Sequence, residues 1–281
     1  MDFLQPRTWA EALAMRAERP DAVPIAGGTD LMVELNFDRR RPAAVLDLTR
    51  VRELARWEPD GAWLRVGAGV TYARVISELG DRLPGLALAS RTVGSPQIRN
   101  RGTVGGNLGT GSPAGDALPP LLAAGAEVEV ASRAGGPRRI PMADFCLGPK
   151  RTALRPDELI AAVRVPAATG PQQFAKVGTR NAMVIAVASF ALDLDVERGR
   201  VGTGIGSAGP TPLRARAAER FLEGVLAEGL GVTTAVIARF AELVAEAAQP
   251  IDDVRGTAGY RRHALGVLAR RTLAWAWAGA R

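Results

Sequence analysis

The chain carries two glycine-rich stretches, Ala26-Gly27-Gly28-Thr29-Asp30-Leu31 and Thr103-Val104-Gly105-Gly106-Asn107, and the second leads through Ser112-Pro113-Ala114-Gly115 to the carboxylate of Asp116. Glycine lets the backbone turn with positive φ and lets a ligand approach the amides closely. Successive exposed amides in such turns form concave sites for anions such as phosphate. One loop of this kind would also suit an ordinary tight turn. Two of them, the second followed by a carboxylate, predict a dinucleotide site built from loops, with a diphosphate held from both sides.

Two carboxylates, Asp30 and Asp116, lie in or close to these stretches. Each of them either contacts the ligand or is a solvent-exposed turn residue. A carboxylate beside a diphosphate is repelled unless it faces a sugar hydroxyl. Asp116 follows Asn107 by nine positions, and we therefore assign it to a ribose rather than to phosphate.

The length of 281 residues allows two or three small domains with a sizeable core. The longest apolar run, 182–192, is broken by Ser189 and is shorter than the ~20 residues that span a bilayer. No membrane span is therefore expected. The first residues lack a basic region followed by an apolar one, so we expect no secretory signal and a cytoplasmic protein.

The chain has one cysteine and one histidine, which limits the metal sites that it can form. Cys146 is the only cysteine, which excludes a four-cysteine iron–sulfur cluster held by this chain alone. His263 is the only histidine, which leaves no multi-histidine zinc or iron site. We expect Cys146 in the core and a structural role for His263. Redox chemistry would need an organic cofactor or a partner's metal.

The net charge of +7 raises the question of nucleic-acid binding. The arginines are scattered through both halves, and aromatic residues make up only 5% of the chain, so stacking platforms are scarce. A basic surface that meets an acidic partner subunit is the better interpretation. No nucleic-acid partner is expected.

The hydrophobic pattern predicts strands and helices that do not alternate regularly along the chain. A capping box, Thr8 with Glu11, opens the first helix. The middle of the chain has a turn-rich boundary at 56–61 and a long irregular stretch at 93–116, and a Pro/Gly linker follows at 166–171. The expected strands are 23–26, 45–48, 63–68, 127–130, 160–165, 172–177 and 185–196; the expected helices are 8–19, 71–79, one from Asp116, and two or three from about 214 onward. This order fits an α+β protein.

A G-x-G-x-x-G pattern occurs at Gly204, Gly206 and Gly209. A dinucleotide fingerprint needs a helix that starts at the glycines and a second strand bearing an acid ~20 residues later. Here Pro210 and Pro212 intervene, and helices follow. We interpret these glycines as a structural turn.

Lysine is rare in this chain, because Lys150 and Lys176 are the only two. Lys176 stands in the strand-like segment Phe174-Ala175-Lys176-Val177. It is either an exposed strand lysine or a residue beside the cofactor, and its rarity favours the second.

These features together resemble the FAD-binding medium subunits of the molybdenum hydroxylases, the family of xanthine dehydrogenase and carbon monoxide dehydrogenase. The likeness covers essentially the whole chain. Beyond the two glycine stretches it rests on the segments 144–149 (Asp-Phe-Cys-Leu-Gly-Pro), 157–160 (Asp-Glu-Leu-Ile), 208–214 (Ala-Gly-Pro-Thr-Pro-Leu-Arg), 218–219 (Ala-Glu) and 252–256 (Asp-Asp-Val-Arg-Gly) leading into 260–262. The resemblance implies an α+β fold, with a two-lobed FAD-binding region of the p-cresol methylhydroxylase (PCMH) type followed by an α+β C-terminal domain. The implied division is 1–57 and 58–168 for the two lobes and 171–281 for the last domain.

The resemblance also implies a set of cofactor-binding residues. By position, Pro24, Ile25, Ala26, Gly27, Gly28, Thr29, Asp30 and Leu31 would wrap the diphosphate of FAD from one side, and Thr103, Val104, Gly105, Gly106 and Asn107 from the other. Asp116 would hold a ribose, Val93 and Ile160 would contact the rings, Lys176 would lie near the flavin end, and Ser112 belongs to the same set. Val93 stands where some relatives have an aromatic residue. No catalytic acid or base and no metal ligand is expected.

The implied function is electron transfer within a multi-subunit oxidoreductase. A small partner subunit with 2Fe–2S clusters would deliver electrons through FAD to an external acceptor, and a large partner subunit would hold molybdopterin. One alternative is a self-contained FAD reductase of the UDP-N-acetylenolpyruvoylglucosamine reductase type, for which no compelling proton donor is found. Another is a scaffold without flavin, against which the intact glycines count.

Overall fold

The chain begins with a three-stranded parallel sheet in the order β1-β3-β2, formed by β1 (Asp2–Leu4), β2 (Val23–Ile25) and β3 (Ala44–Asp47). This and all that follows is seen in a computed structural model that describes residues 1–280. The helix α1 (Trp9–Glu18) connects β1 to β2, and the Thr8 hydroxyl accepts a hydrogen bond from the Glu11 amide at 3.2 Å, as its sequence predicts. A helix that the sequence analysis missed, α2 (Leu31–Asn36), follows the first glycine stretch, residues 26–31.

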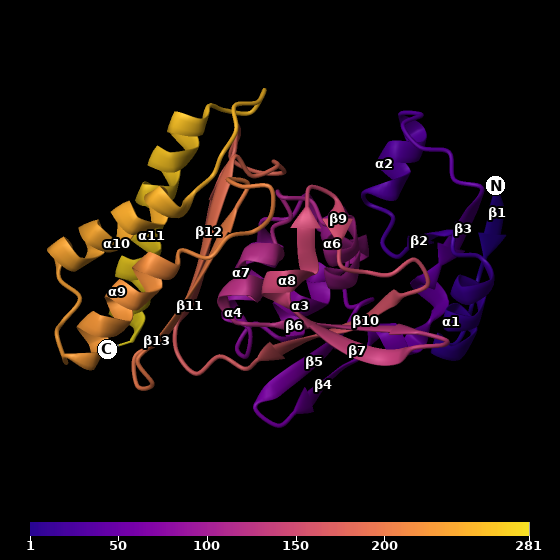
Figure 1. The fold of residues 1–281 in the computed structure, drawn as a ribbon, viewed down its shortest axis with the longest axis horizontal. Helices are drawn as coiled ribbons and strands as arrows, with labels where there is room; N and C mark the ends of the chain where they lie inside the picture. Colours follow the sequence, from indigo (N-terminus) through magenta and orange to yellow (C-terminus); the bar gives the residue numbers. More distant parts are fainter. Residues whose placement is uncertain (281) are drawn as a thin grey trace.

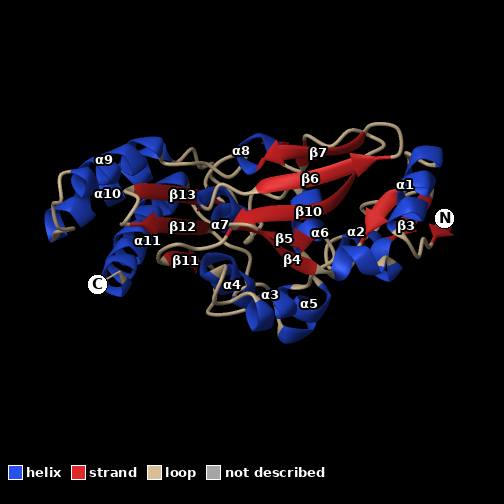
Figure 2. Ribbon diagram, turned by 90° about the horizontal axis from the view of Figure 1, so that it is seen from below, coloured by secondary structure: helices blue, strands red, loops and turns tan. Residues whose placement is uncertain are grey.

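The centre of the molecule is a five-stranded antiparallel sheet in the order β4-β5-β10-β6-β7, seen from its edge strand β7 to β4 in Figure 2. The segment 56–61 was expected to be a boundary of turns, and this is wrong. It forms β4, which pairs with β5 across a turn at Gly61, where φ is +62°. The strands are β4 (Trp57–Asp60), β5 (Trp63–Gly67), β6 (Glu127–Ser132), β7 (Gly136–Pro141) and β10 (Leu159–Pro166).

Short helices surround this sheet. The expectation of an irregular stretch at 93–116 is wrong, because α5 (Pro96–Arg101) and α6 (Val104–Thr110) lie within it. Both are short, and α6 also contains glycines, which lowers intrinsic helicity. The cap at Ser95 stabilises α5, and the cap at Thr103 and the burial of Val104 and Leu108 stabilise α6. The other short elements are η1 (Leu48–Arg50), η2 (Arg52–Ala55), α3 (Tyr72–Glu78), α4 (Pro84–Arg91), α7 (Leu118–Ala123), α8 (Met142–Phe145), β8 (Cys146–Gly148) and β9 (Arg151–Thr152).

The last part of the chain is an antiparallel sheet of β11 (Gln172–Val177), β12 (Ala188–Asp195) and β13 (Arg200–Gly206). Three helices cover one face, namely α9 (Arg216–Ala227), α10 (Thr234–Ala247) and α11 (Ala258–Gly279). Figure 1 shows them at the end of the molecule opposite to α2, while α4 and α7 pack on the inner face of this sheet. The sheet is thus a layer between its own helices and those of the preceding region. The α+β fold is confirmed.

The glycines of the G-x-G-x-x-G pattern have a packing role, but the interpretation as a turn is wrong for two of them. Gly204 and Gly206 lie in β13, and only Gly209 lies in the turn that follows. A Cβ on Gly204 would be 2.0 Å from the carbonyl oxygen of Pro119, and one on Gly202 would be 2.0 Å from that of Ala123. The backbone of α7 therefore lies directly on β13, and side chains there would push the two apart.

Two main cores follow this layout. The parallel sheet and the five-stranded sheet share one hydrophobic cluster, and the C-terminal sheet and its helices form another. Cys146 is buried in the first, as expected, and burial raises the pKa of its thiol to about 11. His263 is exposed on α11. None of the helices in residues 1–280 combines the length and the apolar character needed to cross a bilayer.

Candidate cofactor site

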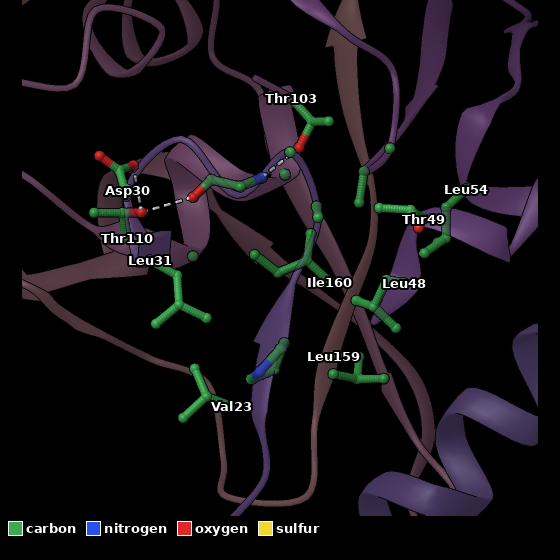
Figure 3. Close-up of a pocket in the computed structure, with 18 of the residues that line it drawn as sticks. Val23, Asp30, Leu31, Leu48, Thr49, Leu54, Thr103, Thr110, Leu159 and Ile160 are labelled. Carbon is green, nitrogen blue, oxygen red and sulfur yellow. Dashed lines mark hydrogen bonds between the residues drawn. The ribbon is translucent and has the colours of Figure 1, made fainter. Parts of the chain in front are cut away.

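The two glycine stretches, residues 26–31 and 103–107, come together in space. A Cβ on Gly27 would lie 2.0 Å from the carbonyl oxygen of Arg101, so the first stretch packs against the backbone that leads into the second. The Thr110 hydroxyl, at the end of α6, donates a hydrogen bond to the Asp30 carboxylate at 3.0 Å. Figure 3 shows this contact, with Thr103 at the start of the same helix. Residues that lie about eighty positions apart thus form one surface.

The first stretch offers unpaired amides. Within residues 1–280, the five consecutive N–H groups from Gly27 to Leu31 donate to no protein acceptor. Gly28 has a φ of +77°, a left-handed conformation that glycine adopts without strain. Consecutive amides in such a turn form a concave site for an anion.

The second stretch differs, because its amides are already used. The Val104 and Gly105 amides donate to the carbonyls of Val70 and Ala68 at 3.1 and 3.0 Å, and those of Gly106 and Asn107 donate to Thr103. A Cβ on Gly105 would lie 2.4 Å from that of Ala68, so this glycine serves close packing of α6. The expected grip by amides from both sides is therefore wrong for the second stretch, which contributes a wall instead.

Two cavities flank this contact. The first, of about 510 Å³, lies between the parallel sheet and the five-stranded sheet, and Val23, Leu31, Leu48, Leu159 and Ile160 surround it in Figure 3. The second, of about 300 Å³, lies between the first stretch, α6 and residues 183–185 of the C-terminal region. Both have the size typical of sites for organic ligands. Residues 26–27, 30–31, 103 and 106 line both cavities, so the unpaired amides lie where the two meet.

Most of the residues expected to bind the cofactor line one or both cavities. They are Pro24, Ile25, Ala26, Gly27, Gly28, Thr29, Asp30, Leu31, Val93, Thr103, Gly105, Gly106, Asn107, Asp116 and Ile160. Three others lie behind the walls. Val104 is buried in the core, the Ser112 hydroxyl accepts a hydrogen bond from the Ala114 amide at 3.3 Å, and Lys176 is buried beside the second cavity.

Lys176 is not the exposed strand lysine of the alternative interpretation, because its side chain is only 8% exposed. Its ammonium group donates to the Asp116 carboxylate at 2.6 Å and to the carbonyls of Thr92 and Val184 at 3.0 and 3.1 Å. All three of its donors are thereby used. Burial raises the pKa of the Asp116 carboxyl, and the ammonium group of Lys176 opposes that rise.

Several buried polar atoms around the cavities have no protein partner among the described residues. Around the second cavity they are Asp116 Oδ1, Asn107 Oδ1 and the hydroxyl of Tyr72, and beside the first it is Arg16 Nε. A buried polar group without a partner is unfavourable, so these atoms indicate a polar ligand. Sequence reasoning missed Tyr72 and Arg16, since each lies in an ordinary helix without a motif.

The site therefore suits a ligand with an anionic centre and two bulky ends. An anion fits the unpaired amides of residues 27–31, and the two cavities lie on either side of them. Among residues 1–280 no group of three or more His, Cys, Asp or Glu side chains is arranged to hold a metal ion.

Comparisons with known proteins agree over the whole length. A family described as the FAD binding domain in molybdopterin dehydrogenase matches residues 1–168, and the CO dehydrogenase flavoprotein C-terminal domain matches residues 173–276. The nicotine 6-hydroxylase medium subunit of Paenarthrobacter nicotinovorans is 33% identical over 96% of this chain and 95% of its own. The carbon monoxide dehydrogenase medium chain of Hydrogenophaga pseudoflava is 29% identical over 99% of this chain and 97% of its own.

Solved structures match equally well. A carbon monoxide dehydrogenase from Hydrogenophaga pseudoflava, in a form that lacks the Mo-pyranopterin moiety of its molybdenum cofactor, superimposes with a TM-score of 0.91 at 30% identity. Quinoline 2-oxidoreductase from Pseudomonas putida superimposes with a TM-score of 0.91 at 27% identity. Each match covers 100% of this chain and 98% of the other.

Proposed function

This chain belongs to the FAD-binding medium subunits of the molybdenum hydroxylase family, and on that premise we propose how it works within its oxidoreductase. It binds FAD. We propose that it passes electrons from 2Fe–2S clusters on a small partner subunit, through FAD, to an external acceptor. A large partner subunit with molybdopterin would carry out the oxidation of the substrate. The chain itself has one cysteine and one histidine, so a four-cysteine cluster has to lie on another subunit.

The observation that carries the proposed site is the row of unpaired amides from Gly27 to Leu31 between two cavities. These amides would hold the diphosphate of FAD. The wall of α6, from Thr103 to Asn107, would limit the diphosphate on its other side. The hydrogen bond between Thr110 and Asp30 holds the two together.

The two ends of FAD would then occupy different cavities. Val93 lines the second cavity and Ile160 the first, so the two apolar residues expected beside the rings would each contact a different ring system. We place the flavin end in the second cavity, beside the pair formed by Asp116 and Lys176. With the flavin end there, the unpaired oxygen of Asp116 would accept a hydrogen bond from a hydroxyl of the ribityl chain, instead of from the ribose that its sequence position suggested.

Bound FAD can take up electrons singly and release them as a pair, so it joins one-electron carriers to a two-electron acceptor. The residues of this chain bind and orient it. Neither Asp116 nor Lys176 needs to act as an acid or base, since the described contacts give each a binding or holding role. We also retain the division of the chain into 1–57, 58–168 and 171–281.

Reconstitution with FAD tests this proposal. The full chain, purified and mixed with excess FAD, should retain flavin absorbance after removal of free ligand. Addition of a reduced 2Fe–2S partner subunit should then bleach that absorbance. Steady oxidation of a nicotinamide by the isolated chain with a sugar-nucleotide substrate would instead favour the self-contained reductase. A folded but colourless protein would favour the scaffold.

A further inference from the structure

We infer that Arg261, on the C-terminal helix α11, is a positioning residue for cofactor binding: through Ser207 it holds the loop 112–116 that bears Asp116. The inference rests on the proposed function, because it assumes that the second cavity takes part of FAD. Arg261 touches neither cavity, so its effect would be indirect.

The loop 112–116 is tied to the C-terminal sheet at two points. One is the ion pair between Asp116 and Lys176 of β11. The other is a hydrogen bond of 2.9 Å from the Ser207 amide to the Pro113 carbonyl. Lys176 and Gly206, the neighbour of Ser207, lie in register across the sheet, both opposite Ser189 of β12. The two ties thus come from the same end of the sheet.

Ser207 is held in an uncommon conformation. Its φ is +59°, a left-handed value that non-glycine residues rarely adopt, and its buried hydroxyl has no partner in the described structure. A residue in this region persists only where its surroundings determine it. The carbonyl of Ser207 accepts a hydrogen bond from the Arg261 guanidinium at 2.5 Å. Arg261 is therefore the contact that fixes the peptide of Ser207.

Arg261 is itself buried and anchored. Only 4% of the residue is exposed, and its other terminal nitrogen donates to the Asp253 carboxylate at 2.5 Å. Burial of an arginine is unfavourable unless its donors are used. The two terminal nitrogens of Arg261 are paired, while its buried Nε has no partner among the described residues. Charge-assisted hydrogen bonds of this kind are short and directional. The guanidinium thus joins the loop that carries Asp253 to the end of β13.

Movement of Pro113 would be transmitted to the cavity. The loop is closed on itself by hydrogen bonds from the amides of Gly115 and Ala114 to Ser112, at 2.9 and 3.3 Å. Ala114 and Asp116 both line the second cavity. If Arg261 were lost, Ser207 would relax, the Pro113 tie would weaken, and these two residues would shift together.

The test compares Arg261→Met with Arg164→Met in the full chain. Arg164 is a matched control, because it is 9% exposed and pairs with Asp60 and Glu127 in the five-stranded sheet, away from both cavities. The measurements are the Kd for FAD, the visible circular dichroism of bound flavin, and the Tm without FAD. We expect Arg261→Met to weaken FAD binding roughly ten-fold and to change the flavin spectrum. Arg164→Met should lower the Tm but leave Kd and spectrum near those of the wild type.

Arg261→Lys is the second variant. It retains the positive charge and is measured if Arg261→Met does not fold. A lysine cannot reach Ser207 and Asp253 with the same fork, so FAD binding should still weaken. Equal Kd values and flavin spectra for the wild type and a folded Arg261 variant would overturn the inference, as would equal losses in the Arg164 variant. Failure of the wild type itself to bind FAD would overturn the proposed site instead.

Discussion

Thr110 donates its hydroxyl hydrogen to the carboxylate of Asp30 across 3.0 Å, and this bond joins α6 to the loop that carries the unpaired amides. The same hydroxyl lies 3.0 Å from the Gly106 carbonyl within its own helix. The position of the loop relative to α6 therefore depends on a few polar contacts and on close backbone packing. Changes at these contacts should affect FAD binding more than folding.

Replacement of Thr110 by valine should weaken FAD binding about three- to ten-fold, because it removes one hydrogen bond and keeps the shape of the side chain. Thr110→Ser is the matched control, since it retains the hydroxyl, and it should bind FAD nearly as the wild type does. Titration of each variant with FAD by flavin fluorescence gives the Kd. Weakening in Thr110→Ser but not in Thr110→Val would show that the methyl group, not the bond to Asp30, is what counts.

Gly27→Ala should weaken FAD binding at least ten-fold and lower the Tm, since the added Cβ would meet the Arg101 carbonyl at 2.0 Å and the loop would have to move. Gly224→Ala serves as the control, because that exposed glycine lies in α9 with nothing within 4 Å of the new atom. There alanine should stabilise the helix by up to about 1 kcal/mol. If Gly27→Ala bound FAD like the wild type, the close packing of Gly27 against the Arg101 carbonyl would be contradicted.

Lys176→Met should destabilise the chain by about 3–5 kcal/mol, because it leaves the buried carboxylate of Asp116 without its ion-pair partner. The double variant Lys176→Met/Asp116→Asn removes both charges and should recover part of that loss. Urea unfolding without added FAD measures the free energies. Lys150→Met is the control, because the Lys150 side chain, which pairs with Glu34, is 64% exposed. This substitution should lower the free energy of unfolding by at most about 1 kcal/mol. No recovery in the double variant would argue against a buried ion pair.

Glu158 should make the stability depend on pH. Hydrogen bonds from the Arg138 guanidinium, at 2.6 and 2.7 Å, lower the pKa of this carboxyl below 4.5, and the Arg155 amide adds to the effect. A carboxyl with a lowered pKa in the folded state stabilises the protein fully above the pKa of the unfolded chain. That stability is lost as pH falls from about 4.5 through the folded pKa.

Glu158→Gln should therefore cost about 2 kcal/mol at pH 7 and much less at pH 3, as measured by urea unfolding at the two values. Glu18→Gln is the control, because Glu18 is 70% exposed and its ion pair with Arg133 is open to solvent. Its variant should differ little from the wild type at either pH. A cost for Glu158→Gln that does not fall with pH would exclude the ion pair as its source.

Much of the fold could be predicted because the signals are local. The helix α1 follows from Thr8 and Glu11, which cap it whatever lies around them. The strands β11 and β12 follow from apolar segments bounded by turn residues, and the pattern of segments implied the α+β class. The family and FAD were implied by motifs spread along the chain, and both are confirmed. The individual binding residues stay predictions.

The errors share one cause, which is stabilisation by distant residues. The glycines of α6 disfavour a helix locally, and the burial of Val104 and Leu108 in the common core outweighs that cost. Gly204 was interpreted as part of a turn because nothing in its neighbourhood shows that Pro119 of α7 lies against it. Trp57 to Asp60 form a strand because β5 supplies the other side of the ladder.

Residue types and their spacing were enough to show where a nucleotide could bind, because glycine turns and a neighbouring carboxylate carry that chemistry in a few adjacent positions. They did not show which amides are unpaired. The amides of Val104 and Gly105 are used by Val70 and Ala68, more than thirty positions earlier, while those of Gly27 to Leu31 meet no acceptor. Folding also paired Asp116 with a lysine sixty positions away. A donor's availability depends on which groups the folded chain brings within about 3 Å, and chain order alone does not contain that information.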